Sequence, residues 1–235
     1  MKILTKQTSE IEEENYQMVK DFALKEGASL FGVADIPPLK EEFFLPEKLV
    51  ENITRGISLG FRLSDKILED IKDKPTHLYY HHYRQVNFFL DRLALKVASF
   101  IQDKGWESLP IPASQIIDWE KQRGHLSHKK VAQRAGLGWI GRNNLLVTPI
   151  FGARVRLVSI LTDMPLRCDT PMEYSCKSCR DCLSVCPAEA IKEEPGEFEH
   201  IKCFEQLKLF RKLGYTSQYI CGICVKACRG NKKQN

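Results

Sequence analysis

The sequence predicts an α+β protein in which a mixed sheet flanked by helices is followed by a small cysteine-rich domain. Three observations support this. Residues 55–63 alternate between apolar and small or polar residues, which is typical of a strand with one buried face. Residues 76–104 repeat apolar side chains at helical spacing. Eight of the nine cysteines lie between residues 176 and 228. We therefore expect two domains, 1–165 and 166–235.

The N-terminal segment begins with a predicted helix from Ser9 to Gly27. Ser9 and Glu12 have the spacing of a capping box, and glycine is a common helix stop. Residues 29–34 form a short apolar run that favours a strand. Residues 37–47 contain three prolines and are predicted to be a loop.

The predicted strand 55–63 carries Gly56 and Gly60 on one face, which suggests a close approach to the backbone or, more simply, a bulge or an edge. Ser64 is expected to cap a short helix, and 76–104 is expected to be the longest helix. The first turns of that helix, Tyr79–Arg84, collect aromatic and titratable side chains. They suit either the wall of a site or an interfacial helix end with partly buried rings.

A glycine-rich loop, Gly136–Asn144, follows a short helix that Ser127 is expected to cap. Gly136, Gly138 and Gly141 bracket a tryptophan. Such a loop lets backbone N–H groups approach a bound group closely, although many glycine loops are only turns. The remaining expected elements are strands at 106–112, 145–148 and 154–161 and a helix at 198–213.

The segment Cys176–Pro187 reads C-x2-C-x2-C-x3-C-P. This is the spacing of bacterial two-cluster ferredoxins, in which the fourth cysteine serves the other cluster. Pro187 lacks an N–H and has a fixed φ, so it keeps the chain from closing over the cluster. Two ligand sets follow for a ferredoxin-like domain with two [4Fe–4S] clusters: Cys176, Cys179, Cys182 and Cys228 for one, and Cys186, Cys203, Cys221 and Cys224 for the other.

Zinc and disulfides are the alternatives for these cysteines. Zinc favours four ligands in C-x2-C pairs, whereas three cysteines at x2 spacing followed by Cys-Pro suit a cubane better. Disulfides need an oxidising compartment, which nothing in the sequence indicates. The second loop lacks a middle cysteine, so Cys203 has to replace that ligand. Cys168, the ninth cysteine, is expected to be a spare thiol near the domain junction.

The composition is that of an ordinary soluble protein, with 43% hydrophobic and 28% charged residues. The formal charge is +5, but each cluster with its four thiolates adds about −2, so the loaded protein is near neutral. A nucleic-acid partner is therefore not indicated. No apolar run reaches the length of a membrane span, and no secretory h-region or twin arginine is present. We expect a cytoplasmic protein with no membrane partner.

The run His-Leu-Ser-His-Lys-Lys-Val-Ala-Gln-Arg-Ala-Gly-Leu-Gly-Trp-Ile-Gly-Arg-Asn-Asn (125–144), then Leu-Thr-Asp-Met-Pro-Leu (161–166), then the cysteines, resembles the epoxyqueuosine reductase family, which is related to reductive dehalogenases. The match is strong over the last half of the chain and loose over the first. The resemblance implies an N-terminal α+β domain that holds base-off cobalamin and two [4Fe–4S] clusters that feed it electrons. A corrinoid would then contact Lys129, Gly136, Leu137, Gly138, Trp139, Gly141, Arg142 and Asn143.

Two departures from the family pattern bear on the substrate. The tRNA-modifying members carry a C-terminal RNA-binding extension, so this chain is expected to be a short member without it. They also carry an acidic proton donor in a Val-Asp-Ser-Ala-Pro-like segment, whereas residues 111–115 here read Ile-Pro-Ala-Ser-Gln. Reduction needs a proton donor. Tyr83, His82 and His128 are the candidates, in that order, and Lys129 and Arg142 supply positive charge near a developing anion or a corrinoid side chain.

Three functions are therefore open. In the first, an external donor of the ferredoxin or flavodoxin type passes electrons through both clusters to a corrinoid, which reduces a small-molecule substrate. In the second, the protein is a two-cluster electron carrier that docks a redox partner protein, and Tyr79–Arg84 and Gly136–Asn144 are interface or core. The third, reduction of epoxyqueuosine in tRNA, is the weakest.

Overall fold

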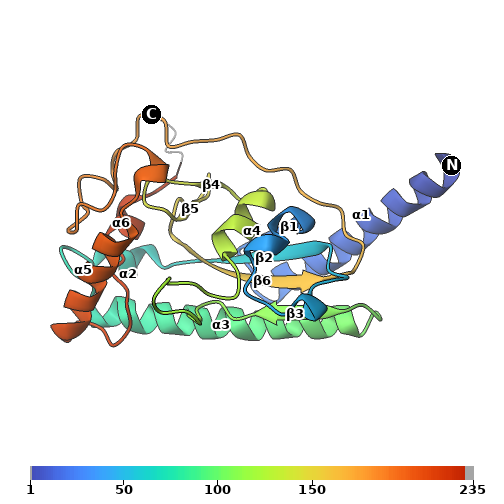
Figure 1. Cartoon of the computed structure of the whole chain (residues 1–235), viewed down its shortest axis with the longest axis horizontal. Coiled ribbons are helices and arrows are strands. Elements are labelled where there is room, and N and C mark those ends of the chain that lie inside the picture. The colour runs from blue at the N-terminus through green and yellow to red at the C-terminus, as the bar shows by residue number, and fades with distance from the viewer. Residues whose placement is uncertain (1, 231–235) are drawn as a thin grey trace. The chain divides into compact units, whose positions relative to one another are not determined.

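The computed structural model describes the chain from Lys2 to Gly230, and its side chains from Thr8 onward. Two compact units are formed, each from three segments of the sequence (Figure 1). Unit 1 comprises residues 2–61, Asn87–Leu137 and Arg156–Met172, and unit 2 comprises Arg62–Val86, Gly138–Val155 and residues 173–230. The predicted division into domains 1–165 and 166–235 stays a prediction.

A four-stranded sheet with the order β1-β2-β6-β3 is the centre of unit 1. Its strands are β1 (Leu30–Asp35), β2 (Arg55–Arg62), β3 (Ser108–Ile111) and β6 (Val155–Thr162). The β1–β2 and β3–β6 pairs are antiparallel, and beside β2 the Thr54 N–H donates to the Thr162 carbonyl oxygen at 3.2 Å. The α+β class is confirmed. The sheet was predicted to be mixed, but its β1–β2 and β3–β6 pairs are antiparallel.

Strand β2 is buried on both faces, whereas alternation in the sequence predicted one buried face. A Cβ on Gly56 would lie 2.4 Å from Ile36 Cδ1 and 3.3 Å from Val131 Cγ1, in helix α4 (His128–Arg134). The Phe61 ring, on the opposite face, lies 5.0 Å from that of Phe89, in helix α3 (His77–Gln102). Gly56 therefore makes room for the side chains packed on it. Burial on both faces explains why polar residues are scarce in β2.

Helix α1 (Lys2–Lys25) packs on β1 and also against α3, where Phe22 stacks on Phe100 with ring centroids 4.3 Å apart. The helix runs through Ser9, so the predicted start at that residue is wrong. Gly27 has a φ of +106°, which ends the helix as expected. The segment after β6 is tied to unit 1 by Asp169, whose Oδ2 accepts from the Val33 N–H at 2.9 Å.

Unit 2 is built from short elements. They are α2 (Asp65–Glu69), the first turns of α3, the hairpin of β4 (Trp139–Ile140) and β5 (Leu146–Val147), α5 (His200–Lys212) and α6 (Ile223–Ala227). The helices predicted after Ser64 and around Cys203 are confirmed, whereas β4 and α6 were not predicted. Among the described residues, no helix has both the length and the apolar character needed to cross a bilayer.

Candidate functional site

Eight cysteines gather in unit 2, and all are free thiols. The first four are Cys176, Cys179, Cys182 and Cys228, here called group A. Burial, together with smaller contributions from the other three cysteines of the group, raises the pKa of Cys182 to about 12. Burial also raises the pKa of Cys228, with further contributions from Cys176 and Cys179. These mutual effects mean that the four sulfurs lie close together.

The other four, Cys186, Cys203, Cys221 and Cys224, form group B. Burial raises the pKa of Cys203 to about 11, with Cys186 adding to it. Burial raises that of Cys221 to about 12, with Cys203 and Cys186 adding to it. The pKa of Cys224 is raised by burial and by the rest of group B, and also by Cys182. Group A and group B therefore adjoin through Cys182 and Cys224.

With pKa values raised to between about 11 and about 12, Cys182, Cys203 and Cys221 stay protonated at neutral pH unless a metal takes the place of the protons. The free thiols of groups A and B fit two [4Fe–4S] clusters, and the two ligand sets stay a prediction. Within residues 2–230, no three His, Cys, Asp or Glu side chains are grouped to ligate one common metal ion. A cubane is a larger group, because each of its four thiolates binds a different iron.

The hairpin loop of residues 138–143 lies directly against group A. The Trp139 indole N–H donates to Cys176 Sγ, with Nε1 3.5 Å from the sulfur. Trp139 is buried with Val147 and Ala153, and its ring stacks on Tyr174 with centroids 5.6 Å apart. The indole is therefore held with its single donor pointed at a cysteine of the proposed cluster site.

Arg142 follows in the same loop, and its buried guanidinium is bound by backbone carbonyl groups. Nη1 donates to the Cys179 oxygen at 2.9 Å, Nη2 donates to the Lys177 oxygen at 2.8 Å, and Nε donates to the Glu193 oxygen. Lys177 has a φ of +43°, which is uncommon for a residue other than glycine. Arg142 therefore fixes the backbone of the first cysteine turn.

The backbone of this loop also packs too closely for side chains at its glycines. A Cβ on Gly138 would lie 2.1 Å from the Val147 carbonyl oxygen, and one on Gly136 would lie 2.7 Å from that of Thr170. A Cβ on Gly141 would lie 3.3 Å from Cys176 Sγ. Five of the predicted corrinoid contacts thus have partners within unit 2, namely Gly138, Trp139, Gly141, Arg142 and Asn143. Gly136 and Leu137 are in unit 1.

Group B is bordered by α2 and the start of α3. A Cβ on Gly222 would lie 2.6 Å from Tyr79 Cε1 and 2.7 Å from Ile71 Cδ1. Lys226 Nζ donates to the Glu69 oxygen at 3.2 Å, while its own carbonyl accepts from Arg154. The first turn of α3 therefore packs on the Cys221–Cys224 turn. This favours the buried helix end over the site wall for Tyr79.

Two of the three proton-donor candidates, His82 and Tyr83, lie in unit 2. His82 Nε2 accepts from the Ser64 N–H at 3.0 Å, so it supports the start of α2. Burial lowers the His82 pKa, and His81 lowers it further. The Tyr83 ring lies 6.4 Å from that of Tyr79. Their role as proton donors stays a prediction.

His128 and Lys129 lie in unit 1, at the start of α4. Ser159 Oγ lies 2.9 Å from His128 Nδ1, and the Pro112 oxygen lies 2.9 Å from Nε2. A carbonyl oxygen can only accept, so Nε2 carries the proton and Nδ1 accepts from the serine. Burial lowers the His128 pKa to about 4, and it lowers that of Lys129 to about 8. A neutral, doubly bonded His128 is poorly suited to donate a proton.

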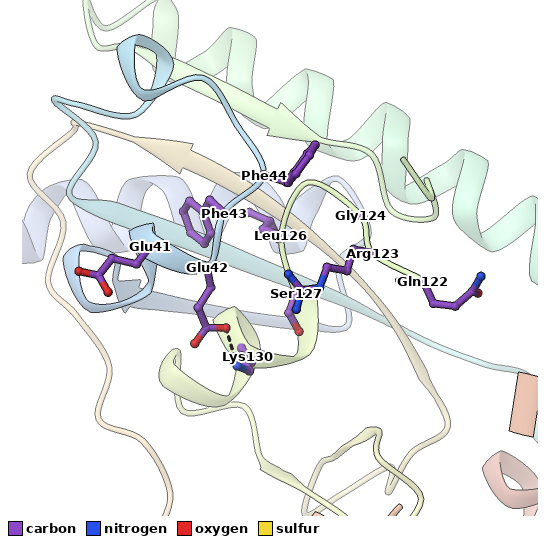
Figure 2. A pocket seen from close by; sticks show the side chains of 10 residues that line it. All are labelled: Glu41, Glu42, Phe43, Phe44, Gln122, Arg123, Gly124, Leu126, Ser127 and Lys130. Carbon is purple, nitrogen blue, oxygen red and sulfur yellow. Dashed lines mark hydrogen bonds and ion pairs between the residues drawn. The ribbon is translucent and has the colours of Figure 1, made fainter. Parts of the chain in front are cut away.

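Unit 1 also contains a cavity of about 650 Å³ that the sequence did not reveal (Figure 2). Lys130 and Glu42 form an ion pair across its wall. The two chain segments that border it are joined by the Phe44 N–H, which donates to the His125 oxygen at 2.7 Å. The one sequence feature that could have indicated this cavity is the aromatic pair Phe43–Phe44 in the proline-rich loop. The lining residues are Glu41, Glu42, Phe43, Phe44, Gln122, Arg123, Gly124, Leu126, Ser127 and Lys130.

Comparison with known proteins gives a consistent picture. No protein-family model matches the chain. It is 35% identical over 135 residues to the epoxyqueuosine reductase of Bacillus anthracis, which covers 54% of this chain and 34% of that protein. The chain spans about a third of the length of the first curated relatives it matches.

Two examples illustrate the solved structures that share the fold. One is a reductive dehalogenase described as B12-dependent, with a TM-score of 0.74, 16% identity, and coverage of 95% of this chain and 32% of the other. The second is epoxyqueuosine reductase from Streptococcus thermophilus, with a TM-score of 0.62, 22% identity, and coverage of 90% and 65%. The resemblance drawn from the glycine loop and the cysteines is therefore confirmed.

Proposed function

We propose that the protein is an iron–sulfur reductase whose unit 2 binds two [4Fe–4S] clusters. The observation that carries the proposal is the gathering of eight free thiols into groups A and B, which adjoin through Cys182 and Cys224. When bound, the clusters would supply one-electron transfer from an external donor of the ferredoxin or flavodoxin type. The residues of unit 2 hold the ligands, exclude water from them and fix the turns that present them.

The cavity of unit 1 supports a reductase over a simple carrier. Its volume lies in the range that small-molecule sites occupy, and it combines aromatic with charged side chains. We propose that this cavity receives the small-molecule substrate, with Arg123 as the cation for an anionic group, since Lys130 is paired with Glu42. The similarity to enzymes named as reductases agrees with this proposal.

The corrinoid that the resemblance implies is less well supported by the residues. Trp139 and Arg142 are occupied by group A and its turn, and Gly138 is closed off by Val147. Gly138, Trp139 and Arg142 therefore do not fit as corrinoid contacts. The contacts at Lys129, Gly136 and Leu137 stay predictions. The solved dehalogenase described as B12-dependent is the remaining support.

This packing favours a second candidate, a two-cluster electron carrier without a reaction of its own. Anaerobic purification with cobalamin present separates the two. Co-purified cobalt and a changed corrinoid spectrum support the corrinoid reductase, whereas iron without cobalt supports the carrier or a reductase with another acceptor. Epoxyqueuosine reduction, which the curated relatives' name specifies, is tested by complementing a strain that lacks that reductase.

A further inference from the structure

The indole N–H of Trp139 donates a hydrogen bond to a cysteine sulfur. Its Nε1 is 3.5 Å from Cys176 Sγ, and an indole can donate but not accept. The ring is 4% exposed and is held between Tyr174 and the small core of Val147 and Ala153. A thiolate would accept this bond more strongly than a thiol does, because the acceptor is then charged.

Asn143 supplies a second donor in the same loop. Its side chain is 3% exposed, and its Oδ1 accepts from the Leu145 N–H at 3.3 Å, which fixes the orientation of the amide. The Nδ2 group is buried and has no hydrogen-bond partner. A buried amide N–H without an acceptor is destabilising, so it indicates an acceptor that belongs at this place.

Gly141 lies close to both groups. A Cβ at this position would lie 2.6 Å from Val147 Cγ2, 3.1 Å from Asn143 Oδ1 and 3.3 Å from Cys176 Sγ. The absent side chain therefore lets this part of the loop pack close to Cys176. Both donors and this glycine belong to the one loop that Arg142 fixes on the first cysteine turn.

We propose that Trp139 and Asn143 donate hydrogen bonds to sulfur atoms of the cluster held by group A and raise its reduction potential. The inference rests on the proposed function, because it requires a cluster at group A. Reduction adds negative charge to the cluster, so N–H donors stabilise the reduced state more than the oxidised state. The loop thus acts as a positioning and tuning element for electron transfer rather than as a corrinoid contact.

Trp139→Phe tests the first donor, since it keeps an aromatic ring and removes the N–H. Midpoint potentials of both clusters are measured by anaerobic redox titration with EPR detection, and iron is counted in the same sample. We expect unchanged iron and one of two potentials lowered. A threefold smaller equilibrium constant for one-electron reduction corresponds to about 28 mV, at 59 mV per tenfold. Tyr174→Leu is the matched control, because it disturbs the stack and keeps the donor.

Asn143→Leu tests the second donor in the same way, and it decides the matter if the Trp139 variant does not fold. Leucine has a similar size, removes the amide donor and adds no charge, so one potential should again fall. Two loaded clusters with potentials unchanged in both variants would overturn the inference and leave the proposed function intact. A wild-type protein without iron–sulfur signals would instead overturn the proposed function.

Discussion

Arg142 Nη1 donates a hydrogen bond to the carbonyl oxygen of Cys179 at 2.9 Å, so a residue of the glycine-rich loop holds the backbone of the first cysteine turn. The same guanidinium binds the Lys177 and Glu193 oxygens. Arginine suits this task because it presents five donors in one rigid plane, whereas lysine presents a single flexible ammonium.

Replacing Arg142 with lysine should therefore loosen this turn. Two or more buried carbonyl groups would lose their partner, and we expect a loss of unfolding free energy on the order of 3 kcal/mol. Thermal unfolding and iron content of the anaerobic protein measure it. Arg180→Lys is the control, because Arg180 makes an exposed ion pair with Glu193 and should change little. Equal stability of the two variants would contradict the role given to Arg142.

Cys203→Ser should remove one cluster and spare the other. Cys203 belongs to group B and is proposed as the ligand that replaces the missing middle cysteine. Iron should fall from about eight atoms to about four per chain, with one set of EPR signals retained. Cys168→Ser should keep both clusters, since Cys168 lies in unit 1 and is a spare thiol in this account. Loss of iron in the Cys168 variant would show that the ligand sets are misassigned.

The sequence indicates the cysteine region because ligand spacing is a local property of the chain, and the gathering of the eight cysteines in one unit agrees with it. The bounds of α3, α4 and α5 followed from apolar periodicity and caps for the same reason. Local patterns do not show which residues pack against each face of a strand or helix. Gly56 resembles an edge or bulge until Val131 and Ile36 are placed against it.

The glycine-rich loop shows this limit most clearly. Its three glycines suited close approach by any large group, and only the tertiary contacts identify Val147, Thr170 and Cys176 as their neighbours. Likewise the cavity of unit 1 joins residues far apart in the sequence, such as Glu42 and Lys130, which are 88 positions apart. No window of sequence contains both.

Gly138→Ala should disrupt the hairpin. Its Cβ would lie 2.1 Å from the Val147 carbonyl oxygen, which is backbone and cannot rotate away. We expect a destabilisation of about 3 kcal/mol, as for an overpacked core, with poor iron retention. Gly196→Ala provides the comparison, because nothing lies within 4 Å of the added Cβ. Chemical denaturation of both variants measures the difference, and similar midpoints would refute the close packing.

His128 should titrate well below an ordinary histidine. Burial lowers its pKa from 6.5 to about 4. Between these two pH values the histidine is protonated in the unfolded chain and neutral in the folded chain. Its contribution to stability is complete above pH 6.5 and is lost as the pH falls towards 4, by up to about 3 kcal/mol. NMR titration of the ring protons, with His128→Gln for assignment, measures the pKa. A midpoint near 6.5 would contradict the buried, neutral ring.

Quantifying iron and acid-labile sulfide in anaerobically reconstituted protein tests the central claim most directly. Two cubanes held by groups A and B predict about eight iron and about eight sulfide per chain, with the absorption and EPR signals of [4Fe–4S] clusters. Four or fewer irons at full loading, or zinc bound in their place, would contradict the account.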